Sequence, residues 1–470
     1  MTTLTTYATV PRDRGLLEAM QESLPQGRIP ARIFNDPEIY QLERERLFSR
    51  AWMYLGHESE IPSPGDYVLR AIADNSIILV RDEAGQVRAH LNMCRHRGNQ
   101  VCKAELGNAS HFRCSYHGWT YKNSGELVGV PYFREVYHEK LDKGEWGLVP
   151  VRVETYQGLI FGNLDPNAEP LAAYLGGFQF YLDLYLKPGP NGTEVYGPPD
   201  RWVADTDWKI CAENFAGDGY HTPVAHQFGF QLGYFPSTAR THYEGYAVHI
   251  PGRGHAIGLG RTPGMPPFFG FPPEIVAAMH ETLSPAQLAV FRDVRTAVCT
   301  VFPNLSILIQ PFSRIPGQPG VRFCTLRLWH PRGAGKLEMF SWCLVPKDAS
   351  PEYKAEAYQA YTLAFGAAGL FEQDDFENWT NVTRQAGSSV VRDLYFPYQM
   401  GLDLVPEEHF PGPGVAVRPY VTETNFRNLW GTWMNYLLTP PDRPVDPSRV
   451  PPALPTSGPG GGDGATTSGA

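Results

Sequence analysis

The sequence predicts an α+β protein in which a small antiparallel β domain precedes a larger domain of mixed strands and helices. Short β-rich runs separated by turn residues fill residues 65–161, a pattern typical of antiparallel strands. Beyond Asp165, strand-like runs alternate with helical ones. The length of 470 residues leaves room for about two or three domains.

The first predicted element is a helix that precedes the β region. Asn35 to Glu38 combine a capping residue, a proline suited to the first helical position and an acidic first turn, so a helix should run from here to about Ser49. Six strands should follow, at residues 67–71, 76–81, 87–92, 111–121, 149–156 and 159–163.

The larger region shows both kinds of periodicity. Strands are expected at residues 301–311, 321–329 and 337–345, and helices at residues 273–297, 351–365 and 371–385. Residues 451–470 are rich in Pro, Gly, Ser and Thr and should form a disordered tail.

Composition excludes several classes of protein. With 42% hydrophobic and 19% charged residues and no apolar run long enough to cross a bilayer, the chain is expected to be globular and to bind no membrane. A net charge of −9 argues against a nucleic-acid partner. Seven scattered cysteines do not form a disulfide framework, and Met1 to Arg14 lack the apolar core of a signal peptide, so a reducing cytoplasm is the expected compartment.

Two pairs of metal-type ligands are the most informative feature of the chain. Cys94 and His96 form a C-x-H pair, and Cys114 and His117 form a C-x-x-H pair. Two cysteines with two histidines are the ligand set of a Rieske [2Fe–2S] cluster, in which histidines replace cysteines on one iron. A structural zinc site is the alternative, but zinc fingers group Cys with Cys and His with His. Glycines 98 and 118 also stand where tight cluster-holding turns need them.

A second constellation follows downstream. A helix capped by Asp205 or Thr206 should run to about Ala216, after which glycines and Pro223 place His221 and His226 at an irregular corner. An oxygen-binding non-haem iron(II) site needs two histidines and one carboxylate.

The carboxylate must then come from another part of the chain. The acidic run Glu372-Gln373-Asp374-Asp375 is the best placed to supply it. Two histidines five residues apart are by themselves more often surface or core residues, and an acidic run is more often a helix N-terminus. Only the conjunction with the upstream Cys/His pairs favours an iron site.

The chain resembles the large (α) subunit of the Rieske non-haem iron aromatic-ring-hydroxylating dioxygenases, of the biphenyl, naphthalene and phenanthrene dioxygenase kind. The resemblance covers about residues 20–440 and rests on the motifs above. It implies that Asp375 completes an iron site with His221 and His226. It also implies that Asp218 bridges a cluster histidine of a neighbouring subunit to an iron-ligand histidine, and that Asn214 is a polar residue beside the iron.

The same resemblance implies a division of labour along the chain. Residues 1–50 would pack on the catalytic domain, residues 51–165 would form the Rieske domain, and residues 166–450 would form the catalytic iron domain, an antiparallel sheet covered by helices. The enzyme would be an oxidoreductase that adds both atoms of O2 to an arene and gives a cis-dihydrodiol. Three α subunits would assemble with three small β subunits.

The electrons are expected to come from another protein. No G-x-G-x-x-G loop opens a helix after a strand, so NAD(P)H should bind a separate reductase, which would act through a ferredoxin. The pocket should be apolar. Phe215, Phe365 and Phe371 lie close in sequence to the proposed ligands, and the resemblance implies that they line this pocket, although ordinary core packing is the alternative for each. Residues 228–235 and 263–273 are the expected entrance loops. Small residues at 366–369 favour a polycyclic or biaryl hydrocarbon as substrate.

Two alternatives stay open on the sequence. A Rieske monooxygenase or demethylase would share every metal ligand and differ in its pocket. A Rieske electron-transfer protein would have lost the second site and would hold only the two irons of the cluster, whereas the oxygenase would hold one more.

Overall fold

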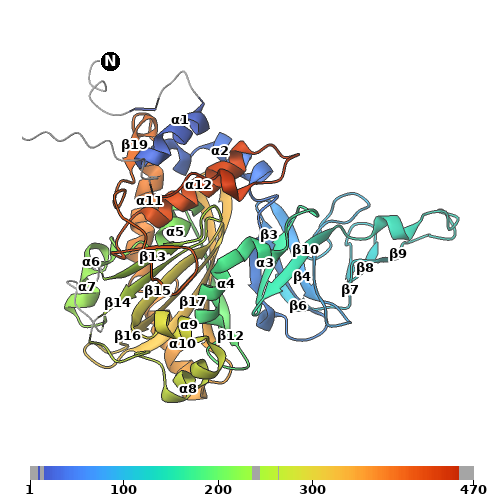
Figure 1. Ribbon diagram of the computed structural model, residues 1–470. Coiled ribbons are helices and arrows are strands. Elements are labelled where there is room, and N and C mark those ends of the chain that lie inside the picture. The colour runs from blue at the N-terminus through green and yellow to red at the C-terminus, as the bar shows by residue number, and fades with distance from the viewer. Residues whose placement is uncertain (1–8, 11–14, 236–243, 263, 455–470) are drawn as a thin grey trace, which may run out of the picture.

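Two antiparallel sheets of different size organise the chain (Figure 1). A computed structural model describes residues 9–10, 15–235, 244–262 and 264–454. The smaller domain has a seven-stranded sheet of order β2-β11-β10-β5-β4-β3-β6 and a three-stranded sheet of order β7-β8-β9. Their bounds are β2 (Met53–His57), β3 (Asp66–Ile72), β4 (Asn75–Arg81), β5 (Val87–Leu91), β6 (Leu106–Asn108), β7 (His111–Arg113), β8 (Thr120–Lys122), β9 (Leu127–Gly129), β10 (Pro150–Tyr156) and β11 (Leu159–Asn163).

The larger domain is built on an eight-stranded antiparallel sheet of order β12-β18-β17-β16-β15-β14-β13-β20. Its strands are β12 (Thr193–Ala204), β13 (Gly245–His249), β14 (Ala256–Arg261), β15 (Val294–Val301), β16 (Leu305–Phe312), β17 (Val321–Gly333), β18 (Lys336–Pro346) and β20 (Val415–Val417). The central strands β15 and β16 are buried along their whole length, as expected for a sheet covered on both faces. The predicted fold class is confirmed.

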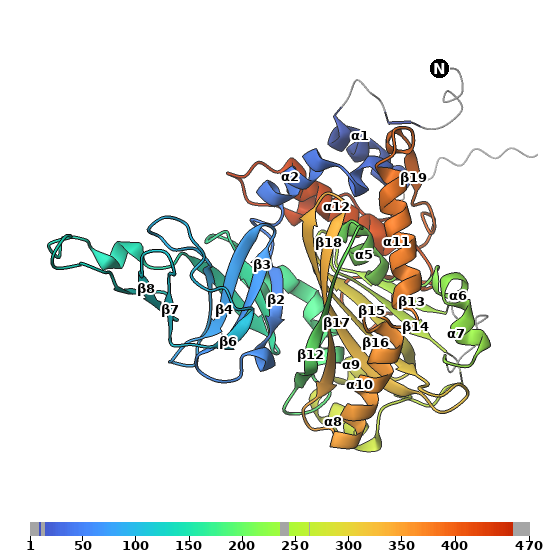
Figure 2. The same ribbon diagram turned by 180° about the vertical axis from the view of Figure 1, so that it is seen from behind.

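Helices cover both faces of this sheet. Helices α10 and α11 lie in front of it in Figure 2, and α4 and α9 lie in front of it in Figure 1. The helices are α3 (Leu171–Leu175), α4 (Gln179–Leu186), α5 (Trp208–Phe215), α6 (Thr222–Ala225), α7 (Gln227–Gln231), α8 (Pro273–Thr282), α9 (Pro285–Phe291), α10 (Pro351–Phe365), α11 (Glu372–Ala386) and α12 (Thr424–Leu438). Short 3-10 turns occupy Leu24–Gln26, Ala31–Phe34, Glu58–Glu60, Lys143–Trp146, Gly176–Phe178, Val391–Asp393 and Pro447–Arg449.

The N-terminal segment packs on the larger domain through a buried charged cluster. It contains α1 (Leu16–Ser23), β1 (Arg28–Pro30), which pairs with β19 (Tyr395–Pro397), and α2 (Pro37–Arg46). Glu43 of α2 lies 2.9 Å from the Lys209 ammonium of α5 and accepts a 2.8 Å hydrogen bond from the indole of Trp433 of α12. Loss of one partner of such a buried pair costs about 3–5 kcal/mol, so this cluster holds α2, α5 and α12 together.

Several predicted boundaries are wrong, each for a local reason. The helix expected to reach Ser49 ends at Arg46, and the helix expected to be capped by Asp205 or Thr206 is capped instead by Asp207, which accepts from the Lys209 N–H at 3.0 Å. The strand expected at residues 111–121 is two strands, β7 and β8, separated by a loop. The strand expected at residues 301–311 begins four residues later as β16.

The helix expected at residues 273–297 is two helices followed by a strand. Ser284 and Pro285 stop α8 and cap α9 with a capping box, and β15 begins at Val294. At the C-terminus, Ala453 is buried and its carbonyl accepts a 2.8 Å hydrogen bond from Arg427, so residues 451–454 belong to the packed part of the chain. The rest of the expected tail, residues 455–470, lies outside the described residues.

Candidate metal centres and active site

Two matching loops at the tip of the smaller domain carry the Cys/His pairs. In each loop the cysteine N–H donates to the carbonyl five residues on, and the N–H four residues on donates back to the cysteine carbonyl. Cys94 thus pairs with Asn99 and Gly98, and Cys114 pairs with Trp119 and Gly118 in the same way. Both glycines have positive φ, 77° and 74°, which a side chain would strain.

The four side chains are arranged as a thiol pair beneath an imidazole pair. Cys94 and Cys114 are buried, each 2% exposed, whereas His96 and His117 are partly exposed. The two Nδ1 atoms of the histidines lie 3.1 Å apart, and the ring of Trp119 stacks on His96 with centroids 5.0 Å apart. The histidine side of the pair therefore faces outward.

Hydrogen bonds to the sulfur atoms suit thiolates rather than thiols. Burial opposes ionisation of Cys114, but N–H groups of Tyr116, His117 and Asn99 outweigh it, so the pKa of this thiol is lowered. The hydroxyl of Tyr121 lies 3.3 Å from the sulfur of Cys94. Hydrogen bonds of this kind tune the reduction potential of an iron–sulfur cluster.

The spread of these ligands fits a two-iron cluster better than one ion. Within the described parts of the chain, three residues offer metal-ligand atoms that all lie within 4.8 Å of one another. They are His221, His226 and Asp375. The two thiols and two imidazoles do not meet this condition together. Two cysteine and two histidine ligands are the set that a Rieske cluster requires, with one iron on cysteines and one on histidines.

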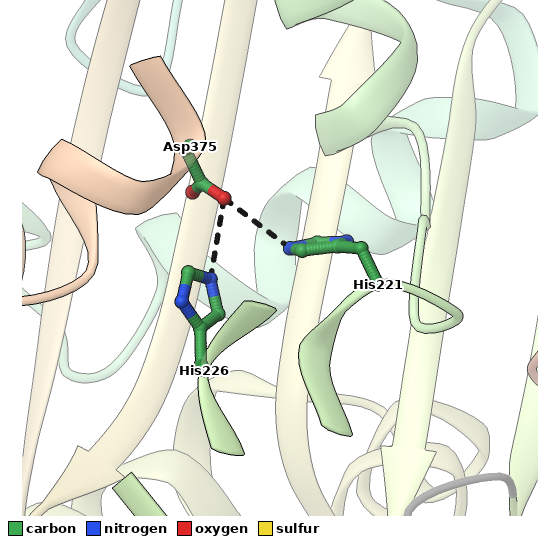
Figure 3. A group of neighbouring side chains, drawn as sticks. All are labelled: His221, His226 and Asp375. Atoms are coloured by element: carbon green, nitrogen blue, oxygen red, sulfur yellow. Dashed lines mark ion pairs between the residues drawn. The ribbon is translucent and has the colours of Figure 1, made fainter. Parts of the chain in front are cut away.

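The second site brings together residues that are far apart in the sequence (Figure 3). His221 precedes α6, His226 lies between α6 and α7, and Asp375 lies in the first turn of α11. One carboxylate oxygen of Asp375 lies 3.5 Å from Nε2 of His221 and 3.2 Å from Nε2 of His226. Two imidazoles and one carboxylate converging on one point are the ligand set of a non-haem iron(II) site.

Each histidine also contacts a carboxylate on its far side. Nδ1 of His221 lies 3.3 Å from Asp218, and Nδ1 of His226 lies 3.3 Å from Asp374. A metal-bound histidine usually gives its second ring N–H to such a group, which fixes the tautomer and the ring orientation. The amide of Asn214 lies 3.4 Å from the same nitrogen of His221. The contact of Asp374 has no counterpart in the expectations from the sequence.

The electrostatics of this site favour a positive charge. Burial alone would lower the pKa of His221, but Asp218 and Asp375 raise it to about 9. The pKa of Asp218 is lowered because, although burial raises it, His221 and two backbone N–H groups stabilise the carboxylate. A bound cation would supply the charge that these carboxylates stabilise, so the residues fit a resident iron ion.

A cavity of about 460 Å³, counted to its open mouth, adjoins the ligands. Phe215 and Phe365 line it as expected, but Phe371 does not. The Phe371 ring is fully buried behind the wall, with its centroid 4.9 Å from that of His226 and 4.8 Å from that of Phe235. Phe371 thus supports the pocket instead of facing it.

Several other residues of the cavity wall were not predicted from the sequence. The lining also includes Thr222, Phe235, Thr296, Val298, Leu308, Gln310 and Tyr420. Phe235 comes from the expected entrance segment 228–235, whereas no described residue of the segment 263–273 lines the cavity, and residue 263 lies outside the described residues.

In the part of the chain that the structure describes, no helix is long and apolar enough to cross a membrane.

Comparison with known families and proteins agrees with this geometry. Residues 51–155 match the Rieske [2Fe-2S] domain, and residues 193–402 match the ring hydroxylating alpha subunit (catalytic domain). The chain is 36% identical to the N,N-dimethyl phenylurea N-demethylase subunit alpha of Sphingobium sp. (strain YBL2), over 90% of this chain and 94% of the relative. It is 34% identical to the biphenyl 2,3-dioxygenase subunit alpha of Rhodococcus jostii (strain RHA1), over 90% and 92%.

A solved structure gives the same result at the level of the fold. Naphthalene 1,2-dioxygenase from Rhodococcus sp., bound to indole, superposes with a TM-score of 0.88 at 45% identity, over 90% of this chain and 97% of that one. The resemblance inferred from the metal-ligand motifs is confirmed, and with it the oxidoreductase class and the two cofactors, a Rieske [2Fe–2S] cluster and a non-haem iron. The chain belongs to the family of ring-hydroxylating oxygenase alpha subunits, which join a Rieske domain to a non-haem iron catalytic domain.

Proposed function

We propose that this chain is the alpha subunit of a terminal oxygenase that adds both atoms of O2 to an aromatic hydrocarbon, polycyclic or biaryl, and gives a cis-dihydrodiol. The observation that carries the proposal is the convergence of His221, His226 and Asp375 beside a cavity walled by phenylalanines. The dioxygenase relatives, at 34–35% identity over most of the chain, support the same reaction.

The residues of the chain would position the ring and hold the metals. Cys94, His96, Cys114 and His117 would hold the cluster, and His221, His226 and Asp375 would hold the iron. When bound, the cluster supplies single electrons and the iron activates dioxygen. The rings of Phe215 and Phe365 would present apolar surface to a planar substrate.

Electrons would enter through partner proteins. We propose a ferredoxin as the immediate donor and a reductase that binds NAD(P)H. The absence of a dinucleotide-binding motif from the sequence supports a nicotinamide site on another chain.

Assembly would bring two metal centres together. In Figure 1 the strands β7 to β9, with the cluster loops, lie at the opposite end of the molecule from α6 and α7, with the iron ligands. We propose a head-to-tail ring of three alpha subunits, capped by three small beta subunits, because such an interface is heterologous and closes. Asp218 would accept hydrogen bonds from His221 and from the partner subunit's His117.

Product analysis tests the reaction. The purified subunits, supplied with ferredoxin, reductase and NADH, are incubated with naphthalene, biphenyl and phenanthrene, and the products are identified by mass spectrometry and chiral chromatography. A cis-dihydrodiol from at least one arene supports the proposal, and consumption of NADH without any oxygenated arene contradicts it. Iron analysis of the same protein should give more than the two irons of a bare Rieske carrier.

Oxidative demethylation is the second candidate. The 36% identical relative is named as an N-demethylase, and the polar Thr296 and Gln310 in the cavity wall fit a substrate with a polar substituent. Incubation with an N,N-dimethyl aryl urea discriminates the two, because a demethylase releases the monomethyl product.

A further inference from the structure

We infer that Thr296 and Gln310 form a hydrogen-bonding subsite that selects substrates carrying a neutral oxygen acceptor on the ring. The inference rests on the proposed function, since it concerns the substrate of the same cavity. It adds a chemical requirement that the metal ligands and the phenylalanine walls do not supply.

The sheet presents the two side chains together. In the antiparallel pairing of β15 with β16, Val298 lies opposite Leu308, and both line the cavity. Thr296 precedes Val298 by two residues on β15, and Gln310 follows Leu308 by two residues on β16, so the four side chains lie on the same face of the sheet. Thr296 and Gln310 also line the cavity. One wall of the cavity is thus an apolar cross-strand pair followed by a polar one.

The polar pair is buried and incompletely satisfied. Thr296 and Gln310 are 6% and 5% exposed, and the threonine hydroxyl donates to the glutamine Oε1 at 3.4 Å, near the upper limit of a hydrogen bond. Among the described residues, the Nε2 group of Gln310 donates no hydrogen bond. This Nε2 group is not among the fully buried unpaired atoms of the described residues and Gln310 lines the cavity, so the donor is open to a ligand atom.

A comparable threonine on the same strand, outside the cavity lining, makes a full set of hydrogen bonds. The hydroxyl of Thr300 donates to the carbonyl of Ala212 at 2.6 Å and lies 2.8 Å from the hydroxyl of Ser306. Thr300 is therefore fully used by the fold, whereas the pair nearer the cavity is not.

The charge of the cavity restricts the acceptor. The described lining residues include the carboxylates of Asp218 and Asp375 and no lysine or arginine. In the holoenzyme the iron and His221 balance these two carboxylates, and the described lining offers no lysine or arginine side chain to pair with a substrate carboxylate. The acceptor is therefore a neutral oxygen, such as that of an ether, a carbonyl or a hydroxyl group.

Two ligands of the same shape test the inference. 1-Methoxynaphthalene and 1-ethylnaphthalene differ in one atom, because an ether oxygen replaces a methylene group. We expect the wild-type holoenzyme to bind the methoxy compound about 3- to 10-fold more tightly in equilibrium dialysis, which is the range for one neutral hydrogen bond. The same ratio is expected in kcat/KM for substrate consumption.

Two variants locate the effect. Gln310→Leu keeps the size of the side chain and removes the donor, so the preference should fall to about one, with the ethyl compound bound at least as well as before. Thr296→Val removes the hydroxyl that orients the amide and should reduce the preference in part. Phe365→Leu, a change in the apolar wall, is the matched control and should weaken both ligands without changing their ratio. Iron content and the Rieske spectrum verify that each variant is folded and loaded.

The outcomes separate the inference from the function on which it rests. Equal affinities of the wild type for the two ligands, or an unchanged preference in Gln310→Leu, would overturn the subsite, since water would then satisfy the amide. If neither compound nor naphthalene is oxygenated although both ligands bind with the expected ratio, the subsite stands and the proposed reaction is wrong.

Discussion

The assignment of the carboxylate ligand makes a quantitative prediction about two adjacent aspartates. Asp375 directs one oxygen to Nε2 of both His221 and His226, whereas Asp374 contacts only the far nitrogen of His226, at 3.3 Å. Asp375→Ala removes one of the three ligands. Asp374→Ala leaves all three in place and removes only the group that orients one of them.

The magnitudes follow from these positions. Removal of an orienting group typically lowers metal affinity about 10- to 100-fold, which is about 1.4–2.7 kcal/mol. Asp374→Ala should therefore keep iron when the metal is supplied in excess and lose it on dialysis. Asp375→Ala should lose more than about 100-fold in affinity and all oxygenation, because two imidazoles alone are a poor iron(II) site.

The assay combines iron analysis, product formation and the electron-spin-resonance spectrum of the reduced cluster. The cluster lies at the opposite end of the molecule, so its spectrum should be unchanged in both variants (Figure 1). Asp374→Asn is the matched control, since its amide oxygen still accepts from the His226 N–H, and it should retain most of the affinity. Full activity in Asp375→Ala together with a dead Asp374→Ala would show that the ligand assignment is wrong.

Three further predictions concern electron flow, pocket size and pH. Asp218→Ala should keep both metal centres when iron is supplied in excess, and it should lower the rate at which the reduced cluster is reoxidised, with substrate and dioxygen present, by roughly 10- to 100-fold; an unchanged single-turnover rate, or an active monomer on sizing, would rule out a relay between subunits. Phe365→Trp should lower turnover of phenanthrene by roughly tenfold more than that of naphthalene, because overpacking costs about 1–3 kcal/mol; equal losses would place Phe365 in the core. Burial raises the pKa of Glu213 to about 8, although Tyr398 and Trp430 donate hydrogen bonds to its carboxylate. Because the folded state binds this proton more tightly than the unfolded state does, the protonated carboxyl stabilises the fold at low pH. This contribution to stability is lost as the pH rises from about 4.5 to about 8. The unfolding temperature should fall across that window in the wild type and less in Glu213→Gln, and parallel curves would assign the decline to other groups.

The candidate metal ligands could be located in the sequence because their pattern is local. Each Cys/His pair and the two histidines of the second site occur within a few residues, and ligand type and spacing carry most of the information. Asp375 is more than a hundred residues from His221. The acidic composition of its helix start pointed to the run 372–375, and only the resemblance to the family singled out Asp375 within it. The contact of Asp374 with Nδ1 of His226 depends on which side of the imidazole ring α11 approaches, and no sequence pattern indicates this side.

The fold errors have equally specific causes. The single strand expected across residues 111–121 is interrupted at the cluster loop: Phe112 and Cys114 occupy one phase of a two-residue period, whereas Trp119 and Tyr121 occupy the other. Helix α12, which was not predicted from the sequence, is buried at nearly every residue, including polar ones such as Asn425 and Arg427. Strand β12 contains two adjacent prolines, which an edge strand tolerates at an irregularity in the register.

The pocket was the least predictable part. Thr296, Val298, Leu308 and Gln310 stand at alternating positions of two buried strands, and alternation alone does not distinguish a cavity wall from the core. Phe371 shows the converse error, since proximity in sequence to Asp375 placed it in the pocket whereas the fold places it behind the wall.

Isotope incorporation tests the central claim most directly. The reconstituted enzyme is given an arene that it oxygenates under an atmosphere of ¹⁸O2, and the product is analysed by mass spectrometry. A dioxygenase with this site should place labelled oxygen at both new carbon–oxygen bonds of a cis-dihydrodiol. A product that carries one labelled atom, or a dealkylated product with the label lost, would show that the chain is a monooxygenase or demethylase and would contradict the account.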